Sequence, residues 1–316
     1  QLFARTHQVS ALVVQRRACR ARRELGHQPG DAAAGAFQRL HDLMADGQAQ
    51  ATAGAHVARR EGLEQAGRQF VINAGRIAGF DIVTPPSRLQ DYYSQPGDTD
   101  GLRHWLQANT PAADGIILSI DQLLYGGLLA SREKEKTPAE IQSMLQFLRD
   151  LHNDCPTIPI YAFSILPRQT PQDTIDGYQE RKDLLAYSRL RGRQAAGLPV
   201  DTAELTRLKA SIPPDSMNRY LTHFKENEEL NRQLLQLTKD GVLSQLILGQ
   251  DDGEPYSIPN IEKNKLRQFM SAQRLTEPQV FLTHGADEIA LSILAGIQNQ
   301  QTGFKPRILV RYNDRS

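Results

Sequence analysis

Short apolar runs alternate with segments of helical spacing from about residue 71 to the end of the chain. The strand-like runs lie at 80–83, 115–120, 158–165, 243–248, 280–283 and 307–310. Parallel strands are joined by crossover segments that are usually helical, so this alternation predicts an α/β fold with a mainly parallel sheet. We expect an open, doubly wound sheet in preference to a closed barrel.

Capping residues mark where several helices begin. Asp98-Thr99-Asp100 precedes an amphipathic segment and supplies candidate N-caps. Thr137-Pro138-Ala139-Glu140 has the pattern of a capping box with proline at the first helical position, which predicts a helix that reaches about His152.

Residues 171–240 interrupt the strand–helix alternation and predict a helical insertion. Helical spacing covers 174–190 and 215–237, with Pro213-Pro214 between them. The second helix places these residues three or four positions apart, where they can share a face: Tyr220, His223, Phe224, Asn227, Asn231 and Leu234. We interpret this face as a stripe that packs in the core, with a pocket lined by its polar members as the alternative.

The amino-terminal part of the chain differs from the rest in composition. Residues 1–70 contain 15 Ala and 10 Arg but no Tyr, Trp or Lys, and the first lysine is Lys134. Because few large apolar side chains are available to anchor a core, we expect loosely packed helices here. The predicted division is therefore an atypical Ala/Arg-rich segment at 1–72 and an α/β domain at 73–316.

Charge and cysteine content narrow the range of partners. Lys+Arg 37 and Asp+Glu 36 give a net charge of +1, so no global positive field attracts nucleic acid. Cys19 and Cys155 lack the spacing of a disulfide framework or a zinc–thiolate site, and no apolar stretch approaches the roughly 18 residues of a membrane span. We expect a small-molecule or carbohydrate ligand, no nucleic acid and no membrane span, while the oligomeric state is not indicated. A cytoplasmic location is the default expectation, although a chain that lacks its true amino end would hide a secretion signal.

Three of the strand-like runs lead into acidic residues. Asp121 follows one run, Asp251-Asp252 follow another, and Asp287-Glu288 lie shortly after a third. Ligands of open α/β sheets bind beyond the carboxyl ends of the parallel strands, so we expect these acids to converge on one pocket. Each has a structural alternative: for Asp121, hydrogen bonds from the backbone of Tyr125-Gly126-Gly127; for Asp252, a turn with Gly253; and for Asp287, a helix cap.

The segment from Asp121 to Arg132 is the most specific signal in the chain. Its Gly126-Gly127 pair permits a tight turn and a close approach to a ligand, and Tyr125 offers a phenol for stacking or hydrogen bonding. Arg132 can clamp a carboxylate or phosphate, or can pair with Asp121 itself. The candidate substrate-binding residues are Tyr125, Gly126, Gly127, Arg132, Arg168 and His284.

Together, the Asp121–Arg132 segment, Asp251-Asp252 and Gly285-Ala286-Asp287-Glu288 resemble the signature segments of an uncharacterised bacterial family, the domain of unknown function numbered 4127. The resemblance runs from about residue 73 to residue 316, and it implies no established reaction. Members of that family typically open with a strand that ends in an Asp-Arg-Pro type motif, and they continue beyond this carboxyl end. We therefore expect a fragment, in which residues 1–72 replace a missing strand and part of the site is absent.

Clustered carboxylates beside a tyrosine and an arginine point first to a hydrolase that acts on a small polar or carbohydrate-like substrate. One carboxyl can protonate the leaving oxygen while a second stabilises positive charge or activates a nucleophile. The Gly-Ala-Asp-Glu string is similar to the Gly-Gly-Asp-Glu string of hexosaminidases that use substrate assistance, which implies Glu288 as the acid and Asp287 as the orienting group. The candidate catalytic residues are Asp121, Asp251, Asp252, Asp287 and Glu288.

Two other classes of protein fit the same residues. A divalent-metal hydrolase would use the acids as oxygen ligands for Mg²⁺ or Mn²⁺, although the chain has no recognised metal motif. A carbohydrate or small-molecule binding protein would use the same acids only to accept hydrogen bonds. No cofactor other than such a metal ion is expected, because the chain has no GxGxxG, P-loop, HExxH or GxSxG sequence.

Overall fold

A computed structural model of the chain describes residues 11–16, 61–92, 94–251 and 254–305. The chain divides into two compact units, Gln1–Gln15 with Ile82–Ala290, and Arg16–Asp81 with Leu291–Ser316. The candidate site residues that the structure describes all belong to the first unit. The division at residue 72 stays a prediction.

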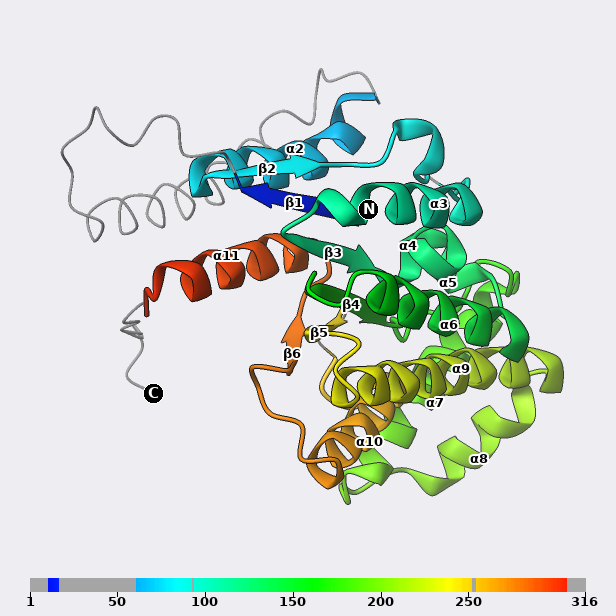
Figure 1. The fold of residues 1–316 in the computed structure, drawn as a ribbon. Helices are drawn as coiled ribbons and strands as arrows, with labels where there is room; N and C mark the ends of the chain where they lie inside the picture. The colour runs from blue at the N-terminus through cyan, green and yellow to red at the C-terminus, as the bar shows by residue number, and fades with distance from the viewer. Residues whose placement is uncertain (1–10, 17–60, 93, 252–253, 306–316) are drawn as a thin grey trace, which may run out of the picture. The chain divides into compact units, whose positions relative to one another are not determined.

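The strands form one six-stranded sheet in the order β2-β1-β3-β4-β5-β6 (Figure 1). Their bounds are β1 Ala11–Arg16, β2 Phe80–Val83, β3 Gly115–Ser119, β4 Ile160–Leu166, β5 Gln245–Gln250 and β6 Val280–His284. Strands β3 to β6 pair in parallel with their sequence neighbours. The predicted α/β fold with a mainly parallel sheet is confirmed, and the sheet is open because β2 and β6 stand at the two ends of its order.

The expectation of helix in the amino-terminal segment is wrong for Ala11–Arg16. These residues form a strand that pairs antiparallel with β3, with Ala11 opposite Leu118 and Val14 opposite Gly115. Ala11, Leu12, Val13 and Val14 are at most 1% exposed. The alanine- and arginine-rich average of the segment concealed this short apolar run, whose β-branched residues suit a buried strand.

The helices in the described part of the chain have the bounds α2 Glu61–Ala78, α3 Thr99–Asn109, α4 Ile120–Tyr125, α5 Leu128–Glu133, α6 Pro138–Asp154, α7 Tyr178–Ala195, α8 Thr202–Ser211, α9 Pro214–Lys239, α10 Ile258–Ala272 and α11 Ile289–Thr302, with short 3₁₀ turns at Ser87–Leu89 and Thr110–Ala112. Of these helices, α3, α6, α7 and α9 lie close to the segments that the sequence predicted. Asp98 caps α3 by accepting a hydrogen bond from the Gly101 N–H at 2.9 Å. The predicted capping box is also confirmed, since Thr137 and Glu140 bond to each other's backbone N–H at the start of α6.

The predicted helical insertion is confirmed, but it contains three helices where two were expected. The additional helix is α8, which Asp201 caps by accepting a hydrogen bond from the Glu204 N–H. Helix α7 begins at Tyr178, later than the expected residue 174. Helix α9 also serves as the crossover between β4 and β5, because Leu230, Leu234 and Leu237 on it join the core beneath the sheet.

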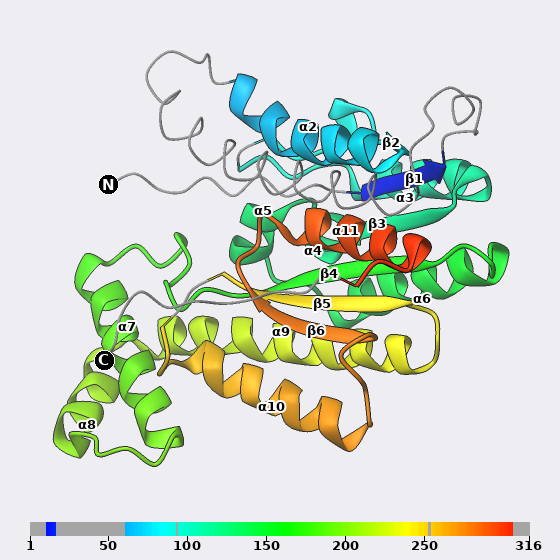
Figure 2. The same cartoon turned by 90° about the vertical axis from the view of Figure 1, so that its left-hand side faces the viewer.

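One face of the sheet is covered by α6, α9 and α10. Met144 and Leu148 of α6, Leu234 of α9 and Leu266 of α10 are fully buried in the same cluster as alternate residues of the strands. Helices α9 and α10 lie side by side beneath β5 and β6 (Figures 1 and 2). This packing holds the parallel strands in place, and the candidate site lies at their carboxyl ends.

The predicted core stripe on α9 is confirmed at its apolar members. Tyr220 and Phe224 are at most 2% exposed, and their rings meet edge to face at 5.0 Å. They belong to a second apolar cluster with α7 and α8.

No helix in the described part of the chain is long and apolar enough to cross a membrane. The strand expected at 307–310 lies outside the described residues.

Candidate functional site

Four neighbouring parallel strands deliver the candidate residues to one edge of the sheet. Asp121 lies in the first turn of α4, two residues after the end of β3, and Arg168 lies two residues after the end of β4. Asp251 directly follows β5, and Asp287 comes three residues after β6. Because the carboxyl ends of parallel strands share an edge, residues from four separate segments of sequence meet there.

The Asp121–Arg132 segment folds as two short helices joined by two glycines. Helix α4 ends at Gly126, which has φ 83°, and Gly127 with φ 151° precedes α5, which carries Arg132. A Cβ on Gly126 would lie 2.8 Å from the Gly97 carbonyl oxygen, and one on Gly127 would lie 2.6 Å from Asp91 Oδ2. The observed role of the glycine pair is therefore close packing against the 91–97 loop, while the expected approach to a ligand stays a prediction.

The Asp121 carboxyl group is 3% exposed and has internal partners. Its Oδ2 accepts a hydrogen bond from the Ile165 N–H at 3.1 Å, which ties the start of α4 to β4. Burial raises the pKa of Asp121 to about 6, although hydrogen bonds with Ser131 and the Ile165 N–H, and the charge of Arg132, act in the opposite direction. Asp121 thus accepts a backbone hydrogen bond, as the structural alternative expected, but the donor is Ile165 of β4 and not the Tyr125-Gly126-Gly127 segment.

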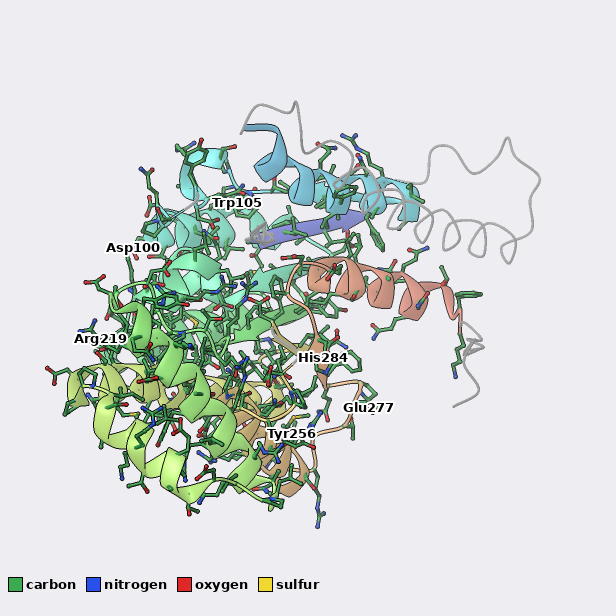
Figure 3. All side chains as sticks on the ribbon, turned by 180° about the vertical axis from the view of Figure 1, so that it is seen from behind. Asp100, Trp105, Arg219, Tyr256, Glu277 and His284 are labelled. Atoms are coloured by element: carbon green, nitrogen blue, oxygen red, sulfur yellow. The ribbon has the colours of Figure 1, made fainter. Side chains whose placement is uncertain are left out.

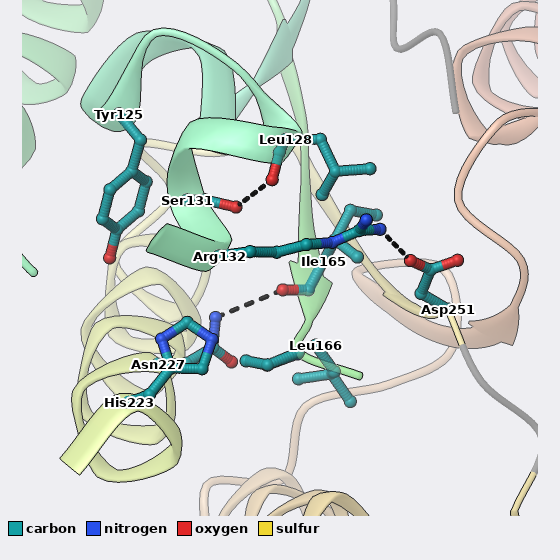
Figure 4. Close-up of a pocket in the computed structure, with 10 residues that line it drawn as sticks. Tyr125, Leu128, Ser131, Arg132, Ile165, Leu166, His223, Asn227 and Asp251 are labelled. Carbon is teal, nitrogen blue, oxygen red and sulfur yellow. Dashed lines mark hydrogen bonds and ion pairs between the residues drawn. The ribbon is translucent and has the colours of Figure 1, made fainter. Parts of the chain in front are cut away.

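Asp251 is clamped by two arginines. Arg168 donates through Nε to Oδ2 at 2.5 Å and through Nη2 to Oδ1 at 2.9 Å, and Arg132 donates through Nη2 to the same Oδ2 (Figure 4). The Asp251 side chain is only 6% exposed, against 20% for Arg132 and 25% for Arg168. Two-pronged bonding of a planar carboxylate is the strong form of this interaction. Of the described strand-end acids, Asp251 is therefore the one with side-chain ion pairs to Arg132 and Arg168.

Asp287 lies at the solvent side of these ion pairs. Its side chain reaches solvent, yet the surrounding protein removes part of its hydration. This desolvation, together with the neighbouring carboxylates of Glu288 and Asp251, raises the pKa of Asp287 to about 6 against the opposing charges of Arg168 and Arg132. Glu288 and His284 are also exposed, with His284 closing β6 (Figure 3). Asp252 lies outside the described residues.

A small cavity lies between Arg132 and helix α9. It is lined by Tyr125, Ser131, Arg132, His223, Asn227 and Asp251, together with apolar residues at the end of β4 (Figure 4). The space open to the centre of a water molecule is about 10 Å³, which is near the minimum for one water. A ligand group larger than that can enter only if a side chain that now fills the site moves.

The cavity wall from α9 contains residues that the sequence did not assign to a site. Asn227 donates to the Ile165 carbonyl oxygen at 3.2 Å, and burial, with the charge of Arg132, lowers the pKa of His223 to about 4. The Tyr125 hydroxyl donates to Glu226 Oε1 at 2.6 Å, and burial raises the pKa of this phenol. The sequence signal for these residues was the spacing of His223 and Asn227 on one face of the helix. The apolar members of that face pack in the core, and its polar members His223 and Asn227 line the cavity.

A larger cavity of about 310 Å³ lies between α7 and α10. Tyr256, Asn260, Asn264 and Lys265 line it from the α10 side, and Ala195 and Ala196 line it from α7. None of the predicted site residues that the structure describes takes part in it. The Asp121–Arg132 segment, which is the most specific signal in the sequence, therefore does not line the larger cavity.

Metal-binding geometry was sought among the same residues. In the part of the chain that the structure describes, no three His, Cys, Asp or Glu side chains are grouped so that they could share a metal ion. Asp251 is already paired with the guanidinium groups of Arg132 and Arg168.

The fold and these contacts define an α/β protein with an arginine–carboxylate site at the carboxyl edge of its parallel strands. The chain matches the model of a family described as a protein of unknown function, DUF4127, over residues 66–316, and it belongs to that family. This confirms the resemblance carried by the Asp121–Arg132 segment. No curated protein and no solved structure matches the chain.

Proposed function

We propose that this protein is a hydrolase for a small polar or carbohydrate-like substrate, with Asp287 as the acid that protonates the leaving group. The observation that carries the proposal is the position of Asp287, an exposed carboxyl with a pKa of about 6 beside an arginine-held carboxylate. A general acid works best when its pKa is near the working pH. Pairs of carboxyl groups in contrasting environments are typical of acid–base sites.

The environments of the other acids favour this assignment of roles. Asp121 is buried and bonded to the backbone of β4, and Asp251 is held by Arg132 and Arg168, so neither is placed to give a proton to a substrate. Glu288 is exposed next to Asp287 and supplies the second carboxylate of the proposed pair. The hexosaminidase-like string suggested the reverse order, but the raised pKa favours Asp287 as the acid.

The test is a panel of aryl glycosides that includes hexosaminides, assayed between pH 4 and 8 with the full chain. Asp287→Asn should lower kcat by at least about 100-fold, the typical contribution of a general acid. Wild-type activity should fall as the pH rises through about 6, because the acid form of Asp287 is lost there. Asp240→Asn, at an exposed aspartate after α9, is the matched control. Equal activity of the two variants would refute the role of Asp287.

The same panel separates the two alternative functions. Activity that a chelator abolishes and Mg²⁺ or Mn²⁺ restores would favour the metal-dependent hydrolase. Sugar binding without turnover would favour a binding protein, an alternative that has its own support because Asp121 and Asp251 are both satisfied by internal partners.

A further inference from the structure

Arg132 has hydrogen-bonding capacity that its surroundings in the described structure do not use. A guanidinium carries five N–H donors, and the single side-chain hydrogen bond of Arg132 within the described residues runs from Nη2 to Asp251. The side chain is 20% exposed and lines the small cavity, so donors that Asp251 does not use are available to a ligand there. Desolvation and the like charge of Arg168 lower the pKa of Arg132, which indicates that further negative charge would be favourable here.

The present occupant of this cation pair is a carboxylate from the chain itself. Asp251 presents its two oxygens to Arg168 in the planar, two-pronged manner that guanidinium groups prefer, and it shares Oδ2 with Arg132. Arg132 and Arg168 thus both donate to the Asp251 carboxylate, at the edge where α/β proteins bind ligands. The space open to the centre of a water molecule is only about 10 Å³, so a second carboxylate beside the first requires a side chain to move.

On the side of α9, the groups that line the cavity beside Arg132 are neutral. His223 remains uncharged above a pH of about 4, and Asn227 is an amide, so no further fixed charge faces Arg132 from α9. From the other elements, Tyr125 lines the cavity, and the charged groups that interact with Arg132 are Asp121, Asp251, Asp287 and Arg168.

We propose that Arg132 and Arg168 bind the carboxylate of an acidic small-molecule substrate, and that this carboxylate takes the place that Asp251 occupies in the free protein. The inference rests on the proposed function only for the expectation that the ligand is a small polar molecule. Asp251 then acts as an internal competitor, which keeps the arginines paired until a substrate with the same chemical group displaces it.

The test is calorimetric titration of the full chain with glucuronate, with its uncharged amide glucuronamide, and with inorganic phosphate. Wild type should bind glucuronate in preference to the other two. Asp251→Asn, which removes the competing charge, should bind glucuronate at least about tenfold more tightly than wild type, and Arg132→Gln should bind it at least about tenfold more weakly, since a hydrogen bond to a charged group contributes about 1.5–3 kcal/mol and 1.4 kcal/mol is tenfold. Arg207→Gln, at an arginine paired with Glu204 on the exposed side of α8, is the matched control.

Several outcomes would overturn the inference. Equal affinity of wild type for glucuronate and glucuronamide would show that the charge of the ligand does not matter. Tighter binding of phosphate would show that the site does not select a carboxylate. Unchanged binding in Arg132→Gln would remove the role of Arg132. Circular dichroism melts show whether each variant is folded. If Asp251→Asn does not fold, comparison of glucuronate binding by wild type, Arg132→Lys and Arg132→Gln tests the proposal without it. Because binding is measured without turnover, loss of hydrolysis in Asp287→Asn with intact glucuronate binding distinguishes the two proposals.

Discussion

Three aspartates that follow three strands of the same sheet have three different environments. Asp121 is buried and bonded to a backbone N–H, Asp251 is paired with two arginines, and Asp287 faces solvent beside other carboxylates. The first two are the same residue type and lie within two residues of a strand end, so residue type and closeness to a strand end do not set the role. Each role is set by the groups that face the carboxylate.

At the scale of the residue, replacement of Asp121 tests whether it is structural. Asp121→Ala would leave the buried Ile165 N–H without its acceptor, which should cost about 1–3 kcal/mol of unfolding free energy. Asp121→Asn keeps an acceptor oxygen and should cost less. Urea unfolding measures both. An Asp121→Ala variant as stable as wild type but without hydrolase activity would contradict the structural role and restore a chemical one.

The element that shapes the site is the α4–α5 pair, whose two glycines come within van der Waals contact of the 91–97 loop. Gly126 and Gly241 provide a comparison, because their φ angles are 83° and 82°. A Cβ at Gly126 would meet Gly97 and Pro96 atoms at 2.8 Å, whereas one at Gly241 has nothing within 4 Å. Both glycines adopt a left-handed backbone conformation, but only Gly241 has open space for a Cβ.

Alanine substitution at these two glycines separates backbone strain from crowding. Gly241→Ala should cost about 1–2 kcal/mol of stability, the penalty of a left-handed backbone for a residue with a Cβ. Gly126→Ala should cost about 1–3 kcal/mol more, because atoms of the 91–97 loop must move. Thermal or urea unfolding of the pair gives the difference directly. Equal losses would show that the loop yields freely.

Hydrophobic periodicity and capping residues predicted most of the helices and strands, but they missed β1 and α8. The capping box at Thr137 and the Asp98 cap are interactions within four residues, so the sequence alone predicts them. Strand β1 was missed because its partner, β3, lies about a hundred residues later and the composition around β1 is that of a helix. Helix α8 was missed because it is short and lies between longer neighbours.

In the molecule as a whole, charged groups also join helices that the sequence separates. Lys265 on α10 bonds to Glu228 of α9 at 3.0 Å and to Glu262 at 2.9 Å, and Arg232 pairs with Glu228 at 2.8 Å. Burial, followed by the proximity of Glu228, raises the pKa of Glu262 to about 7. This group therefore couples the packing of α9 and α10 to pH.

The pH dependence of stability tests this coupling. A carboxyl group with a raised pKa in the folded state favours folding fully below its unfolded value of 4.5, and this contribution is lost as the pH rises through about 7. Wild type should therefore lose stability relative to Glu262→Gln between pH 5 and 8. Urea midpoints across that range measure the effect, with Glu277→Gln at an exposed glutamate before β6 as the control. A constant difference between wild type and Glu262→Gln would contradict the raised pKa.

The sequence by itself indicated the fold class, most of the helices and strands from residue 80 onward, the family, and the set of strand-end acids, because hydrophobic periodicity and capping are local. Only the tertiary structure decided which side chains meet. Arg132 and Asp251 are 119 positions apart and Tyr125 and Glu226 are 101 apart, so their pairing depends on strand order and on where α9 packs. A carboxylate acts as an acid, a hydrogen-bond acceptor or an arginine partner according to its neighbours, and the fold supplies those neighbours.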